Sequence, residues 1–278
     1  MKVKKNKILI QNGITYSTVI LFWAVIQMLS AGGHVSSLMK GLLVPLCIYG
    51  ILAVSLNLTV GILGELSLGH AGFMCVGAFT GAFLTRCMEA AVPGVGLRFF
   101  LALVVGSAVA GVFGILIGIP VLRLKGDYLA IVTLAFGEII KNLINVMFIG
   151  RDSRGFHFSI KDSLSLGLEE GGEVIVKGAQ GITGTPRAAT FTIGILLLLL
   201  TLVIVLNLMN SRTGRAIMAI RDNRIAAESI GINVTKYKLM AFSVSAALAG
   251  MAGVLYAHSL ATLAATSANF GYNTSIMI

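Results

Sequence analysis

The sequence predicts an all-α fold, in which the single domain 1–278 forms a polytopic transmembrane helical bundle. Hydrophobic residues make up 56% of the chain and charged residues 12%, whereas a soluble domain carries roughly a quarter charged residues. The mean hydropathy is +0.93. The apolar residues are also grouped into runs of the length that crosses a lipid bilayer, so composition and arrangement indicate the same class of fold.

Seven apolar runs each approach the ~20 residues that a transmembrane helix needs. They lie at 12–31, 41–62, 66–86, 99–122, 128–149, 190–209 and 239–259. The lysines before the first run resemble the start of a signal peptide, but the run is of span length and further spans follow, so we expect an uncleaved first helix. The fourth run carries a stripe of small residues that predicts close helix packing. The stripe consists of Gly106, Ala110, Gly114 and Gly118.

Positive charges set the expected orientation, because cytoplasmic loops of membrane proteins are enriched in Lys and Arg. The N-terminal lysines, the Arg123/Lys125 pair and the loop 211–238 should therefore share the cytoplasmic side. Six predicted crossings separate the N-terminus from that loop, which agrees with this assignment. The segment 150–189, with five basic and five acidic residues, is expected to be an external loop.

Several other functions are disfavoured by the sequence. The net charge of +10 does not indicate nucleic-acid binding, because the basic residues cluster at the ends of apolar runs. Cys47, Cys75 and Cys87 form no CxxC pair and are expected to be small buried hydrophobes. The sequence contains neither HExxH nor the phosphate-binding GxxxxGK[ST] motif, so it predicts no metal site, no cofactor and no ATP hydrolysis in this chain.

Residues 61–81 form a glycine-rich apolar stretch that contains Gly64, Glu65, Gly69 and His70. Glycine at this density weakens a helix, and broken backbone at membrane depth occurs where protein buries it or where it lines a cavity. One interpretation is therefore a break along a solute pathway, as in transporters with discontinuous helices. The other is a tight turn between two spans, with Glu65 near the cytoplasmic interface and His70 in a structural hydrogen bond.

Residues 126–145 carry Glu138, Lys141 and Asn142 deep in an apolar run. Glu138 lies about 16 Å along a helix from Asp127, and ionisable residues at such depth mark candidate functional sites. One hypothesis places Glu138, Lys141 and Asn142 beside the solute pathway. The alternative is that Glu138 and Lys141 form a pair at positions i and i+3, which neutralises itself inside the bundle.

The loop 211–238 is basic, and its apolar residues recur at helical spacing, which is typical of an amphipathic helix with a partner-sized surface. Its arginines include Arg215, Arg221 and Arg224. On this hypothesis Ile217 and Ile220 fill a cleft on the partner, since apolar anchors dominate affinity, and Gly231 ends the helix in a left-handed conformation. A helix lying on anionic membrane lipid fits the same pattern.

Three stretches resemble the branched-chain amino acid ABC transporter permease family, and its LivM-type subunit more than its LivH-type. They are LNLTVGILGELSLGHAGFMCVGAFTGAFL from Leu56, GDYLAIVTLAFGEIIKNLIN from Gly126 and GRAIMAIRDNRIAAESIGINVTKYKLMAFSVSAALAGMAGVLYA from Gly214. The run from Ala226 to Gly231 also resembles the signature of importer permeases. Family members continue into a further span after the position of Ile278, so we expect this chain to be truncated.

The resemblance implies an ABC importer permease of the bacterial inner membrane, surrounded by membrane lipid. The positive charges predict that its N-terminus is cytoplasmic. It also implies a second, LivH-like permease chain, two cytoplasmic ATP-binding subunits that carry ATP and Mg²⁺, and a periplasmic solute-binding protein. The loop 211–238 would be the coupling segment that docks on the ATPase. Its coupling residues would be Arg215, Ile217, Ile220, Arg221, Arg224, Ala226, Ala227, Glu228 and Gly231.

The solute that the resemblance implies is a branched-chain amino acid, with urea, amides or other amino acids as alternatives. Two hypotheses from other classes remain open on the residues alone. One is an ion-coupled secondary transporter that uses Glu65, Glu138 or Lys141. The other is a membrane scaffold without a solute path.

Overall fold

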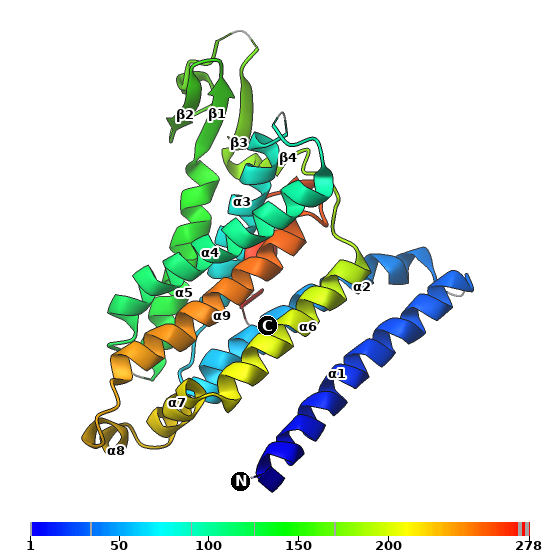
Figure 1. The fold of residues 1–278 in the computed structure, drawn as a ribbon. Helices are drawn as coiled ribbons and strands as arrows, with labels where there is room; N and C mark the ends of the chain where they lie inside the picture. The colour runs from blue at the N-terminus through cyan, green and yellow to red at the C-terminus, as the bar shows by residue number, and fades with distance from the viewer. Residues whose placement is uncertain are drawn as a thin grey trace.

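In a computed structural model the protein is a bundle of long helices with a small sheet at one end (Figure 1). The structure describes residues 2–278 except 34, 90, 125, 170, 272, 273, 276 and 277, and it describes residues 2–9 by their backbone only. Lys125 and the side chains of the N-terminal lysines, on which the expected orientation partly rests, therefore lie outside the described residues.

Within the described residues, seven long helices form the bundle. They are α1 (Lys2–Ala31), α2 (Ser37–Asn57), α3 (His70–Cys87), α4 (Val95–Val121), α5 (Asp127–Val146), α6 (Phe191–Asn210) and α9 (Val234–Ala257). Each overlaps one of the seven predicted runs. Six helices of the described chain are long and apolar enough to cross a membrane, and α3 is the long helix outside that set. α3 is rich in glycine and carries His70 and Arg86, which lowers its hydropathy.

α9 lies at the centre of the bundle, where α2, α3 and α4 pack around it. Small residues permit this packing: a Cβ atom on Gly77 of α3 would clash with the backbone of Gly250 of α9. The predicted stripe on α4 also faces α9, because a Cβ atom on Gly114 would lie 2.6 Å from that of Ala246. Small residues let helix backbones approach closely in lipid. α1 packs against α6 and remains mostly exposed.

A five-stranded antiparallel sheet stands at one end of the bundle. Its strands are β1 (Phe148–Asp152), β2 (Gly155–Ser159), β3 (Glu173–Lys177), β4 (Ile182–Thr183) and β5 (Thr262–Leu263), in the order β2-β1-β3-β4-β5. The first four lie almost wholly in the predicted external loop 150–189. β5 follows α9, so the pairing of Ile182 with Leu263 ties the C-terminal segment to this loop. The bundle is helical as predicted, and the sheet is an addition to the predicted all-α fold.

The opposite end of the bundle carries a π-helix, η1 (Leu58–Leu63), and two short α-helices, α7 (Arg212–Asp222) and α8 (Arg224–Ser229). The start of α1 and the turn between α4 and α5 lie at this end too (Figure 1). The segments that were expected to share one side of the membrane are therefore at one end of the molecule. A last short helix, α10 (Ser267–Phe270), packs against α3.

Candidate functional site

The connection between α2 and α3 is an unwound segment and not a tight turn. α2 continues into η1, Gly64 takes a left-handed φ of 79°, and residues 64–69 form no helix before α3 begins at His70. A left-handed backbone at this point favours glycine, because a side chain would be strained there. Residues 64–69 are called the unwound segment below.

The unwound segment and the start of α3 pack against α5. The backbone N–H of Leu68 donates to Oγ1 of Thr133 at 3.0 Å, and a Cβ atom on Gly69 would clash with the carbonyl group of Thr133. Thr133 lies in the second turn of α5, ~9 Å along the axis from the start of that helix. Within the unwound segment Ser67 and Gly69 are buried, whereas Gly64 and Leu66 are exposed. Non-helical backbone inside a membrane is tolerated where protein buries it or where it lines a cavity, and a break along a solute pathway stays a prediction.

Glu65, in the unwound segment, forms an ion pair with Lys238 in the second turn of α9. Their side chains are 16% and 6% exposed, so both charges are largely withdrawn from water. Removing one partner of a buried pair leaves the other charge uncompensated, which destabilises a fold much more than the loss of a surface pair. The pair therefore fixes the unwound segment to the central helix.

His70, at the start of α3, lies in the structural hydrogen-bond network that one interpretation of the sequence expected. Its Nε2 is 2.7 Å from Oγ of Ser55, and Ser245 donates to the carbonyl oxygen of Ser55 at 2.5 Å. His70 is buried, and these bonds join α2, α3 and α9. In the part of the chain that the structure describes, no group of three His, Cys, Asp or Glu side chains lies close enough to hold a metal ion.

Glu138 and Lys141 form an ion pair on α5, and Nζ of Lys141 also donates to Oγ of Ser267 at 3.0 Å. Lys141 is 5% exposed, so its charge is buried in the protein. Ser267 belongs to α10, and the C-terminal segment therefore folds back to reach this pair. No local pattern in the sequence could indicate Ser267, because it is far from α5 along the chain.

The glycine-rich stretch 61–81 and the stretch 126–145 are adjacent in the fold. A Cβ atom on Gly72 of α3 would lie 2.7 Å from Cα of Gly137 of α5, and Gly137 directly precedes Glu138. Asn142, in contrast, is exposed. One residue turns a helix by ~100°, so the side chain that follows Lys141 faces away from the pair. The structure thus joins Glu138 and Lys141 to the start of α3 but does not group Asn142 with them.

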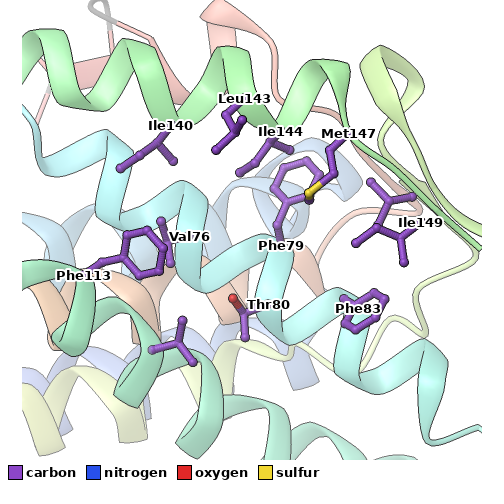
Figure 2. Close-up of a pocket in the computed structure, with 12 residues that line it drawn as sticks. Val76, Phe79, Thr80, Phe83, Phe113, Ile140, Leu143, Ile144, Met147 and Ile149 are labelled. Atoms are coloured by element: carbon purple, nitrogen blue, oxygen red, sulfur yellow. The ribbon is translucent and has the colours of Figure 1, made fainter. Parts of the chain in front are cut away.

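An apolar pocket of about 280 Å³ opens between α3, α4, α5 and the base of the sheet (Figure 2). It is lined by Val76, Phe79, Thr80, Phe83, Val109, Phe113, Ile140, Leu143, Ile144, Met147, Ile149 and Val176. Among these residues only Thr80 contributes a hydroxyl group, and a charged ligand group without partners would be costly to bury there. The pocket therefore suits an apolar group. Its lining comes from distant parts of the chain, so no sequence motif marks it.

The amphipathic helices α7 and α8 have an orientation opposite to the predicted one. Ile217 and Ile220 were expected to enter a cleft on a partner, but they are 0% and 3% exposed because α7 packs back onto α6, α9 and η1. Ala227 is also buried, against Ile220 and Val234. The apolar side chains that face outward are Ile225 and Ile230, which are 79% and 75% exposed.

The other residues predicted for coupling remain accessible. The exposed ones are Arg215, Arg221, Arg224, Ala226, Glu228 and Gly231, and Arg224 pairs with Glu228 at 3.0 Å. The predicted single helix is broken at Asn223, whose side chain accepts the N–H of Ala226 and caps α8. Gly231 has a φ of 83°, which confirms the predicted left-handed helix end. The N–H of Ile232 bonds back to the carbonyl of Ala227 across this turn.

Comparison with known proteins gives matches over most of the chain. A family model described as "Branched-chain amino acid transport system / permease component" matches residues 38–278. The high-affinity branched-chain amino acid transport system permease protein LivM of Salmonella typhimurium is 40% identical over 220 residues, which cover 76% of this chain and 50% of that protein. The protein of the same name from Escherichia coli is 39% identical over 220 residues, with the same coverage.

A probable branched-chain amino acid transport permease protein LivM of Methanocaldococcus jannaschii is 25% identical over 240 residues, which cover 75% of this chain and 64% of that protein. The chain spans about half the length of the Salmonella and Escherichia relatives. No solved structure matches it.

Proposed function

The chain belongs to the branched-chain amino acid transport permease family, and on that basis we propose that it is the membrane-spanning subunit of an ATP-driven importer of branched-chain amino acids. The family match over residues 38–278 carries this proposal, because it includes the bundle, the unwound segment and helices α7 and α8 together. The six apolar helices of the described chain, together with the family, make it a multi-pass membrane protein of the transport class and not an enzyme.

The proposal includes an orientation and a set of partners. The end with α7 and α8 faces the cytoplasm and meets two ATP-binding subunits that carry ATP and Mg²⁺, because the sequence itself has no phosphate-binding loop. The N-terminus is on the same side of a bacterial inner membrane. The sheet faces the periplasm and a solute-binding protein, and a second, LivH-like permease chain completes the translocation path.

We further propose that the solute path follows the seam between the unwound segment and α5. Gly64, Glu65 and Gly69 would contribute from one side of this seam, with His70 behind them. Glu138 and Lys141 would contribute from the other side. Two features support this placement. One is backbone without helical hydrogen bonds that packs against α5, and the other is the ion pair of Glu138 with the buried Lys141, which begins one residue beyond the contact of Gly72 with Gly137.

The test is uptake by the reconstituted complex. The chain is produced together with the second permease and the ATP-binding subunits encoded beside it, and the complex is placed in proteoliposomes with the neighbouring solute-binding protein. Labelled leucine should enter only with ATP, and excess isoleucine or valine should compete while urea and amides do not. Replacing the P-loop lysine of the ATP-binding subunits should abolish this uptake. Competition by urea or amides alone would reassign the solute.

An ion-coupled secondary transporter is the second candidate, and the pairing of Glu138 with the buried Lys141 is the observation that favours it. This candidate predicts leucine uptake by the chain alone, in liposomes with an imposed pH gradient and without nucleotide. The importer predicts no uptake under those conditions, so one preparation distinguishes the two.

A further inference from the structure

Arg221, the penultimate residue of α7, contacts the connection between α2 and α3 at two places. Its Nη1 donates to the carbonyl oxygen of Gly61 in η1 at 3.0 Å. Its aliphatic part lies against Gly64, where a Cβ atom would be 2.6 Å from Cγ of Arg221. Asp222 accepts from Nε and Nη2 at 3.2 and 3.1 Å, which holds the guanidinium group in this orientation. Arg221 thus contacts both the π-helix η1 and Gly64, the first residue of the unwound segment.

A second anchor reaches the same segment from the other side of α8. Lys238, near the start of α9, pairs with Glu65, the residue after Gly64. The two anchors therefore stand immediately before and shortly after the exposed helix α8 along the chain. Both anchors therefore connect the chain that flanks α8 to Gly61, Gly64 and Glu65.

The space between these anchors is not filled by side chains. A cavity of about 220 Å³ is lined by Leu63, Gly64, Glu65, Ile220, Arg221, Arg224 and Lys238. The surrounding residues can therefore change position without first displacing a packed core. The helix hydrogen-bond pattern is also irregular here, since η1 is a π-helix, and such irregularities frequently occur at functional sites.

We propose that Arg221 is a positioning residue that couples movement of the docking helices α7 and α8 to the unwound segment. The inference rests on the proposed function, because it requires a partner that moves these helices. Arg221 itself need not contact the solute or the ATP-binding subunit. When α8 moves, the hydrogen bond to Gly61 and the contact with Gly64 make η1 and residues 64–65 follow it.

The test compares leucine uptake with ATP hydrolysis in the same proteoliposomes. Arg221→Ala should lower the amount of leucine taken up per ATP hydrolysed by about tenfold, the factor expected for loss of one charge-assisted hydrogen bond. Assembly with the ATP-binding subunits and the ATPase rate should remain within about twofold of the unsubstituted complex, since rim charges contribute little to docking. Arg221→Lys keeps the charge but not the forked geometry, so it should restore the ratio only in part.

Arg212→Ala is the matched control, because Arg212 is an exposed arginine at the other end of the same helix. It should leave uptake per ATP unchanged. If Arg221→Ala also leaves that ratio unchanged, or lowers uptake and ATP hydrolysis in parallel, the coupling role is excluded. Failure of the unsubstituted complex to take up leucine with ATP would instead overturn the proposed function, so the two failures are distinguishable.

Discussion

Lys141 is a buried cation whose partners come from its own helix and from the C-terminal segment. Glu138 supplies the countercharge and Ser267 accepts a hydrogen bond. Glu138→Ala leaves the buried charge of Lys141 without the carboxylate that neutralises it, and Lys141→Ala removes the cation that pairs with Glu138. We expect each substitution to lower both uptake and thermal stability, and the double substitution to cost less than their sum. The interaction energy in such networks is ~0.5–3 kcal/mol.

A double-mutant cycle measured on uptake and on thermal unfolding tests this coupling. Ser267→Ala is the milder control, because it removes a neutral hydrogen-bond partner and leaves the ion pair intact. Additive effects of Glu138→Ala and Lys141→Ala would show that the two side chains act independently.

Asp152, at the turn between β1 and β2, makes the sheet sensitive to acid. Its carboxylate is 1% exposed and lies 3.0 Å from Nε2 of His157. Burial of the group opposes ionisation, but N–H groups of Arg154 and Glu169 and the ring of His157 favour the carboxylate, and together they hold its pKa below the ordinary 3.8. A lowered pKa contributes stability that is present above the unfolded-state pKa and lost as the pH falls through the folded-state value.

We therefore expect the β1–β2 hairpin to loosen below about pH 3.8. Hydrogen exchange of residues 148–159 should accelerate in that range relative to Asp152→Asn measured at the same pH, a comparison that cancels the intrinsic pH dependence of exchange. The variant should already exchange faster than the unsubstituted protein at neutral pH, because an amide is a weaker acceptor than a carboxylate. Equal exchange of the two proteins at neutral pH would show that Asp152 does not hold the turn.

At the scale of single elements, α8 presents the surface that the proposed ATP-binding partner would contact. Ile225→Glu places a charge on the exposed face of α8 without disturbing its buried side, so we expect the chain to fold and the complex to dissociate. An interface anchor of this kind contributes ~2 kcal/mol or more. The measurement that checks this is the affinity of the purified chain, with and without Ile225→Glu, for the purified ATP-binding subunits.

Ile220→Ala is the contrasting control, because Ile220 lies on the buried side of α7. Removing a buried isoleucine costs ~2–5 kcal/mol of stability, so this variant should melt earlier and yet bind normally at low temperature. If Ile225→Glu binds as well as the unsubstituted chain, the exposed face of α8 is not the docking face.

The contrast between Ile220 and Ile225 also shows what the sequence could reveal about these elements. Periodicity identifies an amphipathic helix, and it did so for α7, but it does not say which surface the apolar side meets. The seven helical runs were predictable because span length and hydropathy are local properties. The left-handed end at Gly231 was predictable for the same reason.

The sheet, in contrast, depends on contacts between distant residues. β4 and β5 are two residues long, and Ile182 pairs with Leu263, so neither strand has enough residues to show an alternating pattern. The contacts of Lys141 with Ser267 and of Arg221 with Gly61 also join residues that are far apart along the chain, so no local pattern predicts them. Local composition identified Gly64 and Glu65 as candidates, but not the residues that hold them.

In the molecule as a whole, the two ends of the helical bundle carry different kinds of polar surface. One end presents the basic helices α7 and α8, and the other presents the sheet (Figure 1). The sheet end carries opposite charges close together, as in the pairing of Arg86 with Glu89 and Glu173. Because Lys and Arg are retained on the cytoplasmic side, this difference favours a cytoplasmic α7–α8 end.

Cysteine labelling tests that orientation in a background in which Cys87 is replaced by serine. Phe158→Cys lies on the sheet, where the native side chain is 59% exposed, and Ile225→Cys lies on α8, where it is 79% exposed. In bacteria with a permeabilised outer membrane, a membrane-impermeant maleimide should label Phe158→Cys only. Ile225→Cys should react once the inner membrane is disrupted, which shows that the thiol is accessible. The reverse pattern would place α7 and α8 in the periplasm, where no ATP-binding subunit could dock on them. Arg221 could then not couple the movement of such a partner to the unwound segment.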